Sequence, residues 1–313
     1  MSIIDLHCDT IYHISDNKDL ELSKNNLAID LEKLKAGDSL AQFFALFIDL
    51  NEHKNPFNRA MDMLNKFYEQ IEKNSHSIYI ARTYEELMGN KEEEKISAFL
   101  TIEEGEAIEG SIKNLRNFHE LGVRLMTLTW NYENAIGYPN CKKEFMNKGL
   151  KPFGLEVINE MNNLGMIIDV SHLSDGGFYD VAKYSKYPFV ASHSNSRAIC
   201  NHPRNLTDEM IKVISNKGGI MGINFEKSFL NEAGKVSDVD SMIKHIKHIY
   251  NVGGIDSIAI GSDFDGINRE NLEISNMGEI NKIIIGLKKL GLVESQIDKV
   301  LYKNALRIIK DVL

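Results

Sequence analysis

Short apolar runs, rich in β-branched and aromatic residues, alternate along the chain with amphipathic stretches. The amphipathic stretches predict helices: the clearest begins at Asn55-Pro56, a favourable cap and first-turn pair, and another ends at Gly253. The apolar runs predict eight β-strands, near residues 2–8, 40–48, 96–102, 123–129, 166–170, 188–192, 219–224 and 257–261.

This alternation predicts an α/β fold. Several strands are almost continuously apolar, for example MIIDV at 166–170 and SIAIG at 257–261, which is typical of strands buried on both faces of a parallel sheet. Eight such strands with helical crossovers predict a (β/α)8 TIM barrel that spans residues 1–313 as a single domain. An open doubly wound sheet is the alternative, although no G-x-G-x-x-G motif follows the first strand.

The composition is that of a globular protein with a net negative charge. The chain has 36 Lys and Arg against 45 Asp and Glu, and a net charge of −9. Because such a surface repels phosphate backbones and anionic lipids, neither nucleic acid nor a membrane is an expected partner. The opening residues lack the pattern of a secretion signal, and the apolar run at 40–48 is shorter than the ~20 residues that span a bilayer. The three scattered cysteines indicate no disulfide framework, so we expect a cytoplasmic protein.

Ionisable residues gather at the ends of the predicted strands. In a parallel barrel these ends meet on one face, where the chemistry takes place. His or carboxylate side chains follow five strands: His7-Cys8-Asp9, Glu103-Glu104, His172, His193 and Asp263-Phe264-Asp265. Five such ends on one face indicate a site, although the sequence does not decide whether Glu103, Glu104 or Glu106 points inward.

Spacing indicates which of these side chains share a cavity. His7 and Asp9 lie two residues apart at a strand end, so both should point to the barrel mouth, whereas Cys8 should point to the outer helices. His172 and His193 follow successive strands and should lie close together. For each of them, a hydrogen-bonded structural role is the alternative.

The inward set contains five nitrogen and oxygen donors, more than one zinc ion with an open position needs. Five donors are explained if one carboxylate bridges two metal ions, with His7 and Asp9 on one ion and His172 and His193 on the other. Two ions about 3.5–4 Å apart can hold a hydroxide, because metal binding lowers the pKa of water, so hydrolysis is the expected reaction.

Other ionisable residues have different expected roles. Asp263 lies outside the ligand set, where its carboxylate could pass a proton to a leaving group, whereas Asp265 should shape the turn. Arg204 follows the sixth strand, where it can either form a bidentate pair with a substrate carboxylate or cap the next helix, and its position alone does not decide between the two. His245 and His248 have helical spacing on an outer helix and are not expected to bind metal.

Longer motifs contain these residues in a fixed order: DLHCDT at 5–10, TIEEGEAI at 101–108, LGVRLMTLTWNYEN at 121–134, GMIIDVSHLSD at 165–175, ASHSNSRAICNHPRNLTDEM at 191–210 and AIGSDFDGI at 259–267. In this order, and over essentially the whole chain, the sequence resembles the membrane dipeptidase, or renal dipeptidase-like, metallopeptidases, specifically their bacterial cytoplasmic members. The H-x-D opening differs from the H-x-H of the wider amidohydrolases.

The resemblance implies a barrel of the metal-dependent hydrolase type with two zinc ions per chain. His7, Asp9 and Glu103 would bind one ion, and Glu103, His172 and His193 would bind the other. Glu103 matches the bridging ligand because the family ligand is the first glutamate after its strand.

The resemblance also assigns substrate contacts. Asp263 matches the carboxylate that contacts the substrate and handles the proton, and Arg204 matches the arginine that holds the C-terminal carboxylate of a dipeptide. Trp130 stands where mammalian members carry a pocket histidine, so metal, Asn131 or another neighbour must stabilise the reacting oxygen. The secretion signal and lipid-anchor tail of those members are lacking, so their membrane location does not transfer.

We therefore expect a zinc-dependent dipeptidase, with Asp263 and Glu103 as catalytic residues and Arg204, Asp263 and Trp130 in contact with the substrate. A hydroxide held between two metal ions would cleave small dipeptides, including those with a C-terminal D-residue. A homodimer is expected from the family alone. The alternatives are an amidohydrolase of another small amide, such as a β-lactam or an acyl-amino acid, and an inactive barrel with a binding role.

Overall fold

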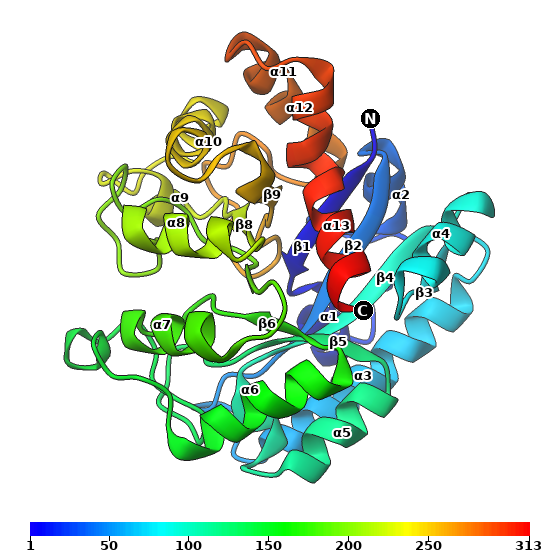
Figure 1. Ribbon diagram of the computed structural model, residues 1–313. Coiled ribbons are helices and arrows are strands. Elements are labelled where there is room, and N and C mark those ends of the chain that lie inside the picture. Colours follow the sequence, from blue (N-terminus) through cyan, green and yellow to red (C-terminus); the bar gives the residue numbers. More distant parts are fainter.

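The strands close into a barrel (Figure 1). The computed structural model describes residues 1–313, and eight parallel strands follow the order β2-β1-β9-β8-β7-β6-β5-β4, closed by the pairing of β2 with β4. Their bounds are Ile3–Cys8 (β1), Ser39–Phe47 (β2), Ile96–Glu103 (β4), Val123–Thr127 (β5), Ile167–Asp169 (β6), Val190–Ala191 (β7), Ile220–Ile223 (β8) and Ile258–Ile260 (β9). The predicted (β/α)8 barrel is confirmed, and the open sheet is wrong.

A ninth strand, β3 (Ile78–Ile80), was not predicted. It pairs with the first half of β4, from Ile96 to Ala98, whereas β5 pairs with the second half of β4 from Leu100 onward. In β3 the exposed Tyr79 lies between the buried Ile78 and Ile80, so this strand lacks the burial on both faces by which the barrel strands were recognised. It extends the sheet beside the barrel without entering the closed ring.

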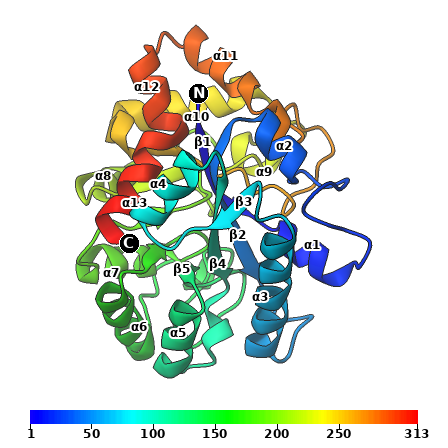
Figure 2. The same cartoon turned by 90° about the vertical axis from the view of Figure 1, so that its right-hand side faces the viewer.

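Helices connect the strands and surround the barrel, as the two views at right angles show (Figure 1, Figure 2). Their bounds are Thr10–Asp16 (α1), Leu31–Ala36 (α2), Pro56–Lys73 (α3), Tyr84–Glu92 (α4), Ile112–Glu120 (α5), Pro152–Leu164 (α6), Asp175–Tyr184 (α7), Asp208–Asn216 (α8), Lys227–Leu230 (α9), Val239–Gly253 (α10), Asn281–Lys289 (α11), Glu294–Asp298 (α12) and Asn304–Val312 (α13). None of these helices has both the length and the apolar character that crossing a bilayer requires.

The two helix ends singled out from the sequence can be compared directly. Helix α3 begins at Pro56 directly after Asn55, as predicted, because proline fits the first helical turn. Helix α10 still includes Gly253, and the glycine that follows its end is Gly254, with φ 82°. The predicted terminal glycine is therefore one residue too early.

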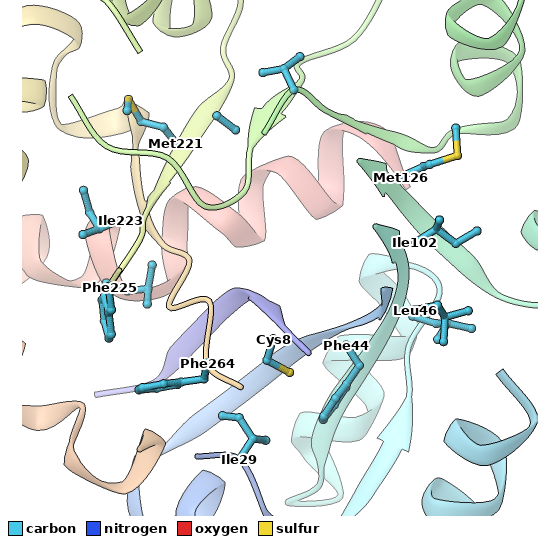
Figure 3. Packing of buried hydrophobic residues seen from close by; sticks show 14 of the residues in the cluster. Cys8, Ile29, Phe44, Leu46, Ile102, Met126, Met221, Ile223, Phe225 and Phe264 are labelled. Carbon is cyan, nitrogen blue, oxygen red and sulfur yellow. The ribbon is translucent and has the colours of Figure 1, made fainter. Parts of the chain in front are cut away.

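Apolar side chains form one layer inside the barrel and another between the barrel and the helices. The inner layer takes side chains from all eight barrel strands, including the stacked rings of Phe43 and Phe99, and α13 covers it with residues such as Ile308. The outer layer contains Cys8, which packs beside Phe44 and Phe264 (Figure 3). Cys8 therefore points away from the mouth, as predicted.

The end of β1 contains an irregularity that bears on the site. Leu6 belongs to the inner layer and Cys8 to the outer one, and the register of β1 on β2 shifts between Asp5 and Cys8. Two consecutive side chains, Leu6 and His7, therefore face inward, and His7 can point to the mouth while Leu6 stays in the core.

Candidate metal centre

Six buried side chains from the ends of five strands meet at the barrel mouth. They follow or terminate β1, β4, β6, β7 and β9, and the most exposed of them keeps only 8% of its surface accessible. They are His7, Asp9, Glu103, His172, His193 and Asp263. The structure thus brings together the five predicted ligands and the predicted proton-transfer residue.

Glu103 lies between two groups of donors. Its Oε2 lies 3.2 Å from Nε2 of His7, and its Oε1 lies 3.1 Å from Nε2 of His172 and 3.4 Å from Nε2 of His193. Asp9 completes the first group, with Oδ2 3.4 Å from Nε2 of His7. One carboxylate therefore contacts both groups, which is the arrangement that a bridging ligand requires.

Hydrogen bonds behind the two paired histidines fix their orientation. The hydroxyl of Ser192 donates to Asp169, so the same oxygen accepts from Nδ1 of His193 at 2.7 Å. Nδ1 of His172 donates to Oδ1 of Asn131 at 3.2 Å. Both rings thus carry their proton on Nδ1 and direct the Nε2 lone pair to the centre, as metal-binding histidines do.

These lone pairs fit a cation. The Nε2 atoms of His172 and His193 face each other at 3.1 Å, with no proton on either nitrogen to join them. In the other group, Nε2 of His7 and Oδ1 of Asp9 are buried without a hydrogen-bond partner. Imidazole nitrogen and carboxylate oxygen are ligands that zinc prefers, so a bound cation would satisfy every one of these atoms.

Two sets of three ligand atoms are each compact enough for one ion. Within each set the atoms lie within 4.8 Å of one another, and the sets are His7 with Glu103 and His193, and His7 with Asp9 and Asp263. His7 occurs in both sets, so the two parts of the centre adjoin each other.

Burial shifts the pKa of most groups at the centre. It raises the pKa of Glu103 to about 8, although His7 beside it acts in the opposite direction. For His7 itself, burial would lower the pKa, but the carboxylates of Glu103 and Asp9 together hold it well above its ordinary value. Burial, followed by neighbouring positive charges, holds the pKa of His172 and of His193 well below the ordinary value. Both therefore stay neutral, the form that binds metal.

Asp263 lies beside the centre with one oxygen held by the protein. Its Oδ2 accepts a hydrogen bond of 2.8 Å from the Asn224 amide, and its Oδ1 lies 3.7 Å from Nε2 of His7. Burial raises the pKa of Asp263 to about 6. A carboxyl group with a pKa close to neutrality is suited to take up and release a proton.

The backbone at two of these strand ends has an uncommon conformation. His172 and Asp263 have φ values of 67° and 62°, in the left-handed region that residues other than glycine rarely adopt. Next to them, Gly266 allows a close approach: a Cβ atom there would lie 2.1 Å from Oδ2 of Asp9 and 2.8 Å from Oδ1 of Asp263. The loop after β9 therefore packs directly against the carboxylates of the centre.

The choice among the three glutamates is resolved by their contacts. Glu103 points to the centre, whereas Glu104 accepts hydrogen bonds from the backbone of Trp130 and from the Asn134 amide. Glu106 accepts from the backbone of Ala135. Both Glu104 and Glu106 therefore hold the loop after β5, which presents Trp130 to the cavity.

Arg204 is buried beside the centre, 3% exposed. Its Nη2 donates to the backbone carbonyl of His193 at 3.1 Å, and its Nη1 donates to the hydroxyl of Ser194 at 3.3 Å. Its Nε has no hydrogen-bond partner, and its guanidinium lies 5.4 Å from the centre of the Phe229 ring. Because Phe229 lines the cavity, this buried cation adjoins the space in which a substrate would lie.

A cavity of about 500 Å³ opens over the centre. Its walls include Glu103, Asp263 and Trp130, which were predicted, and Asp49 and Glu52 from the loop after β2, which were not. Neither acidic residue belongs to a motif that could have revealed it.

Asp169 is a second residue that the sequence did not single out. Its carboxylate accepts from the hydroxyls of Thr127 and Ser192 and from the backbone of Ser171. It precedes the DVSH histidine by three positions on β6, and this spacing is the only signal that could have found it. Its contacts make it a residue that orients His193 through Ser192.

Other ionisable residues have structural partners. The Asp265 carboxylate accepts from the Thr10 hydroxyl and from the Ala28 backbone, which ties the loop after β9 to the first part of the chain. His245 bonds the Ser196 backbone and the Leu230 carbonyl, and His248 lies 2.7 Å from Asp208. The two helical histidines therefore have separate partners.

Several known proteins are similar to this chain over most of its length. A family model described as membrane dipeptidase (peptidase family M19) matches residues 1–313. A Klebsiella pneumoniae protein, described as an uncharacterized protein in the pqqA 5' region, is 34% identical over 230 residues, 70% of this chain and 84% of that protein. An uncharacterized dipeptidase of Schizosaccharomyces pombe is 29% identical over 328 residues, 98% of this chain and 80% of that protein.

A solved structure is similar over the whole chain. It is the crystal structure of a Rhodobacter sphaeroides metallopeptidase with a phosphinate mimic of the dipeptide L-Ala-D-Ala. The TM-score is 0.91 at 23% sequence identity, and the match covers 100% of this chain and 99% of that chain. The likeness shows that the two chains share one fold.

Proposed function

The chain belongs to the membrane dipeptidase family, peptidase family M19, and on that premise we propose that it hydrolyses dipeptides with two zinc ions at the barrel mouth. The observation that carries the proposal is the position of Glu103, whose two oxygens contact separate groups of buried donors. A single-ion site would leave one of these groups without a partner.

The donors divide between two ions that share Glu103. His7 and Asp9 would hold one ion with Oε2 of Glu103, and His172 and His193 would hold the other with Oε1. Zinc ions bound there would supply a nucleophilic water at neutral pH and polarise the scissile carbonyl. Glu103 is in this way both a ligand and a catalytic residue.

The remaining steps belong to side chains of the chain itself. Asp263, with a pKa near 6 and one oxygen held by Asn224, would take the proton of the attacking water on its other oxygen and deliver it to the leaving amine. Arg204 would hold the C-terminal carboxylate, since its Nε is free and its charge is buried. Trp130, whose ring centre lies 6.2 Å from that of His172, would pack against the substrate beside the metal centre.

A substrate panel tests the proposal. The zinc-loaded protein is assayed with L,L-dipeptides, with L,D-dipeptides, with an N-acyl amino acid and with a β-lactam, each with and without a chelator. We expect hydrolysis of L,L-dipeptides and of at least some with a C-terminal D-residue, and loss of activity on chelation that zinc restores. Hydrolysis of only the acyl-amino acid or the β-lactam would replace the dipeptidase proposal, and zinc-independent activity would refute the metal mechanism.

A further inference from the structure

A buried cation that adjoins the cavity and two acidic side chains that line it lie on opposite sides of the barrel mouth. Arg204 follows β7, and Asp49 and Glu52 follow β2. In the closed order β2-β1-β9-β8-β7-β6-β5-β4, three strands separate β2 from β7 in either direction, so these two loops face each other across the mouth. A dipeptide whose carboxylate lies at Arg204 would therefore direct its N-terminal residue toward Asp49 and Glu52.

The two acidic side chains are held in place by tyrosines. Oδ1 of Asp49 accepts hydrogen bonds from the Tyr132 hydroxyl at 3.0 Å and from the Asn51 backbone at 2.8 Å. Oε2 of Glu52 accepts from the Tyr12 hydroxyl at 2.9 Å. The second oxygen of each carboxylate has no hydrogen-bond donor, and neither residue takes part in an ion pair.

No cation of the chain is placed to neutralise them. Seven of the 18 residues that line the cavity carry a carboxylate, and none is Lys or Arg. The nearby Arg59 lies over the Tyr12 ring, but its guanidinium makes a bidentate pair with Asp16 at 2.7 and 2.9 Å. A positive charge that meets Asp49 and Glu52 must therefore come from a ligand.

The other carboxylates of the cavity have partners or a role at the centre. Asp265 accepts two hydrogen bonds from the protein, and Glu226 accepts from the backbone and the hydroxyl of Ser228 at the start of α9. Asp9, which is 4% exposed and has an unpartnered Oδ1, lines the same cavity at the metal centre. Since Asp9 belongs to the proposed metal centre, Asp49 and Glu52 are the carboxylates of the cavity for which neither a protein partner nor an ion accounts.

Aromatic rings line the path from the centre to the two acids. Phe47 and Trp130 pack edge to face with centroids 4.8 Å apart, and Tyr12 packs on Phe47 at 5.4 Å. Phe47 is the last residue of β2 and precedes Asp49 by two positions. An aliphatic stem that ends in a cation can lie along these rings, which attract positive charge, before it reaches the carboxylates.

We propose that Asp49 and Glu52, with the ring wall of Phe47 and Trp130, form the pocket for the N-terminal side chain and select dipeptides that begin with a basic residue. The inference rests on the proposed dipeptidase function and names its preferred substrate class. Because Asp49 is half-buried and Glu52 is exposed, each pair with a ligand cation contributes modestly, and the two together give a preference of about threefold to tenfold.

The test compares two substrates that differ by one ammonium group, L-lysyl-L-alanine and L-norleucyl-L-alanine. For the zinc-loaded enzyme at low salt, kcat/KM should favour the lysyl substrate by about threefold to tenfold, and the ratio should fall when salt screens the charges. The double variant Asp49→Asn, Glu52→Gln keeps the shape of both side chains and should reduce the ratio to about one. Glu133→Gln removes one negative charge from the neighbouring surface, where Glu133 pairs with Lys151, and should leave the ratio unchanged.

Each outcome decides the inference. Equal kcat/KM values for the two substrates, or a lysyl preference that the double variant retains, would overturn it while leaving the dipeptidase function intact. If neither substrate is hydrolysed, the proposed function fails. Calorimetric binding of the same two dipeptides to the zinc-loaded protein then tests whether the pocket prefers a basic side chain. Tighter binding of the lysyl compound, lost in the double variant, would support the pocket, and equal binding would refute it.

Discussion

Single hydrogen bonds decide which atom each histidine offers at the centre. Asp169 takes the Ser192 proton, so Ser192 can only accept from His193, and the ring must present Nε2 to the mouth. Asn131 does the same for His172 through its side-chain oxygen. Asn131 uses its carbonyl oxygen for His172, so its NH2 group remains the part that could donate a hydrogen bond to the reacting oxygen. The chemistry of the centre therefore depends on residues that never contact an ion.

Arg204→Ala should separate carboxylate binding from the reaction itself. Loss of a buried guanidinium that pairs with the substrate carboxylate should lower kcat/KM for a dipeptide by about 100-fold. The matching dipeptide amide lacks that carboxylate and should be affected much less. Arg204→Lys should retain part of the dipeptide activity, because it keeps the charge but loses the paired donors. Equal losses on the dipeptide and its amide would contradict the assigned role.

Gly266→Ala should disturb one side of the metal centre. The added Cβ would lie 2.1 Å from Oδ2 of Asp9, so the carboxylate or the loop after β9 must move. Zinc affinity on the Asp9 side should fall about tenfold or more, which competition with a chromogenic chelator would measure. Gly89→Ala is the control, since Gly89 lies exposed in α4 and a Cβ there would meet no atom within 4 Å. Unchanged zinc affinity in Gly266→Ala would show that Asp9 is not held as described.

At the scale of elements, the strands were predictable and the loops that follow them only in part. Every barrel strand could be recognised from its apolar run, including β7, which has two residues. By contrast, the residue pattern alone does not separate Glu103 from Glu104, and only the family resemblance selected Glu103, because the turn between them depends on contacts with the loop after β5. No motif in the sequence identified Asp49 as a site residue, because its position opposite Arg204 results from closure of the barrel and not from its neighbours in sequence.

Helix α10 should make folding stability depend on pH. His245 accepts a hydrogen bond from the Ser196 backbone, on the loop that carries Arg204, and burial lowers its pKa to about 4. In the unfolded chain His245 has its ordinary pKa near 6.5, so it binds a proton as the pH falls below that value. In the native state it stays neutral down to about pH 4, so the native state loses stability over this range as the pH falls. The loss from this residue should be about 2 kcal/mol between pH 7 and pH 5.

Urea unfolding at the two pH values measures this effect. His245→Gln should be less stable than the wild type at pH 7, because the hydrogen bonds of the imidazole are not fully replaced. Its free energy of unfolding should nevertheless decrease less between pH 7 and pH 5 than that of the wild type. Because the carboxylates of the centre are the same in both proteins, the difference between the two decreases is the contribution of His245. Parallel decreases in the two proteins would show that His245 does not titrate as proposed.

At the scale of the whole molecule, barrel closure collects negative charge in one buried place. Asp9, Glu103 and Asp263 come from three strands and lie around one imidazole, His7, at the mouth of a chain with net charge −9. Burial raises the pKa of both Glu103 and Asp263, which means that their ionised forms are costly in this environment. Burying these carboxylates together therefore costs folding free energy unless bound cations compensate their charge.

Zinc should consequently stabilise the whole barrel. A metal that binds only the native state adds about 4 kcal/mol when its free concentration is 1,000 times its Kd. With an unfolding entropy of ~2.1 cal/mol/K per residue, this raises the apparent Tm of a chain of this length by about 6 °C. Scanning calorimetry of the zinc-loaded and chelated protein should show this difference, and Glu103→Gln, which weakens the shared ligand, should show a smaller one. Equal Tm values after elemental analysis has established metal removal would mean that the buried donors are stable without ions and that their convergence serves another purpose.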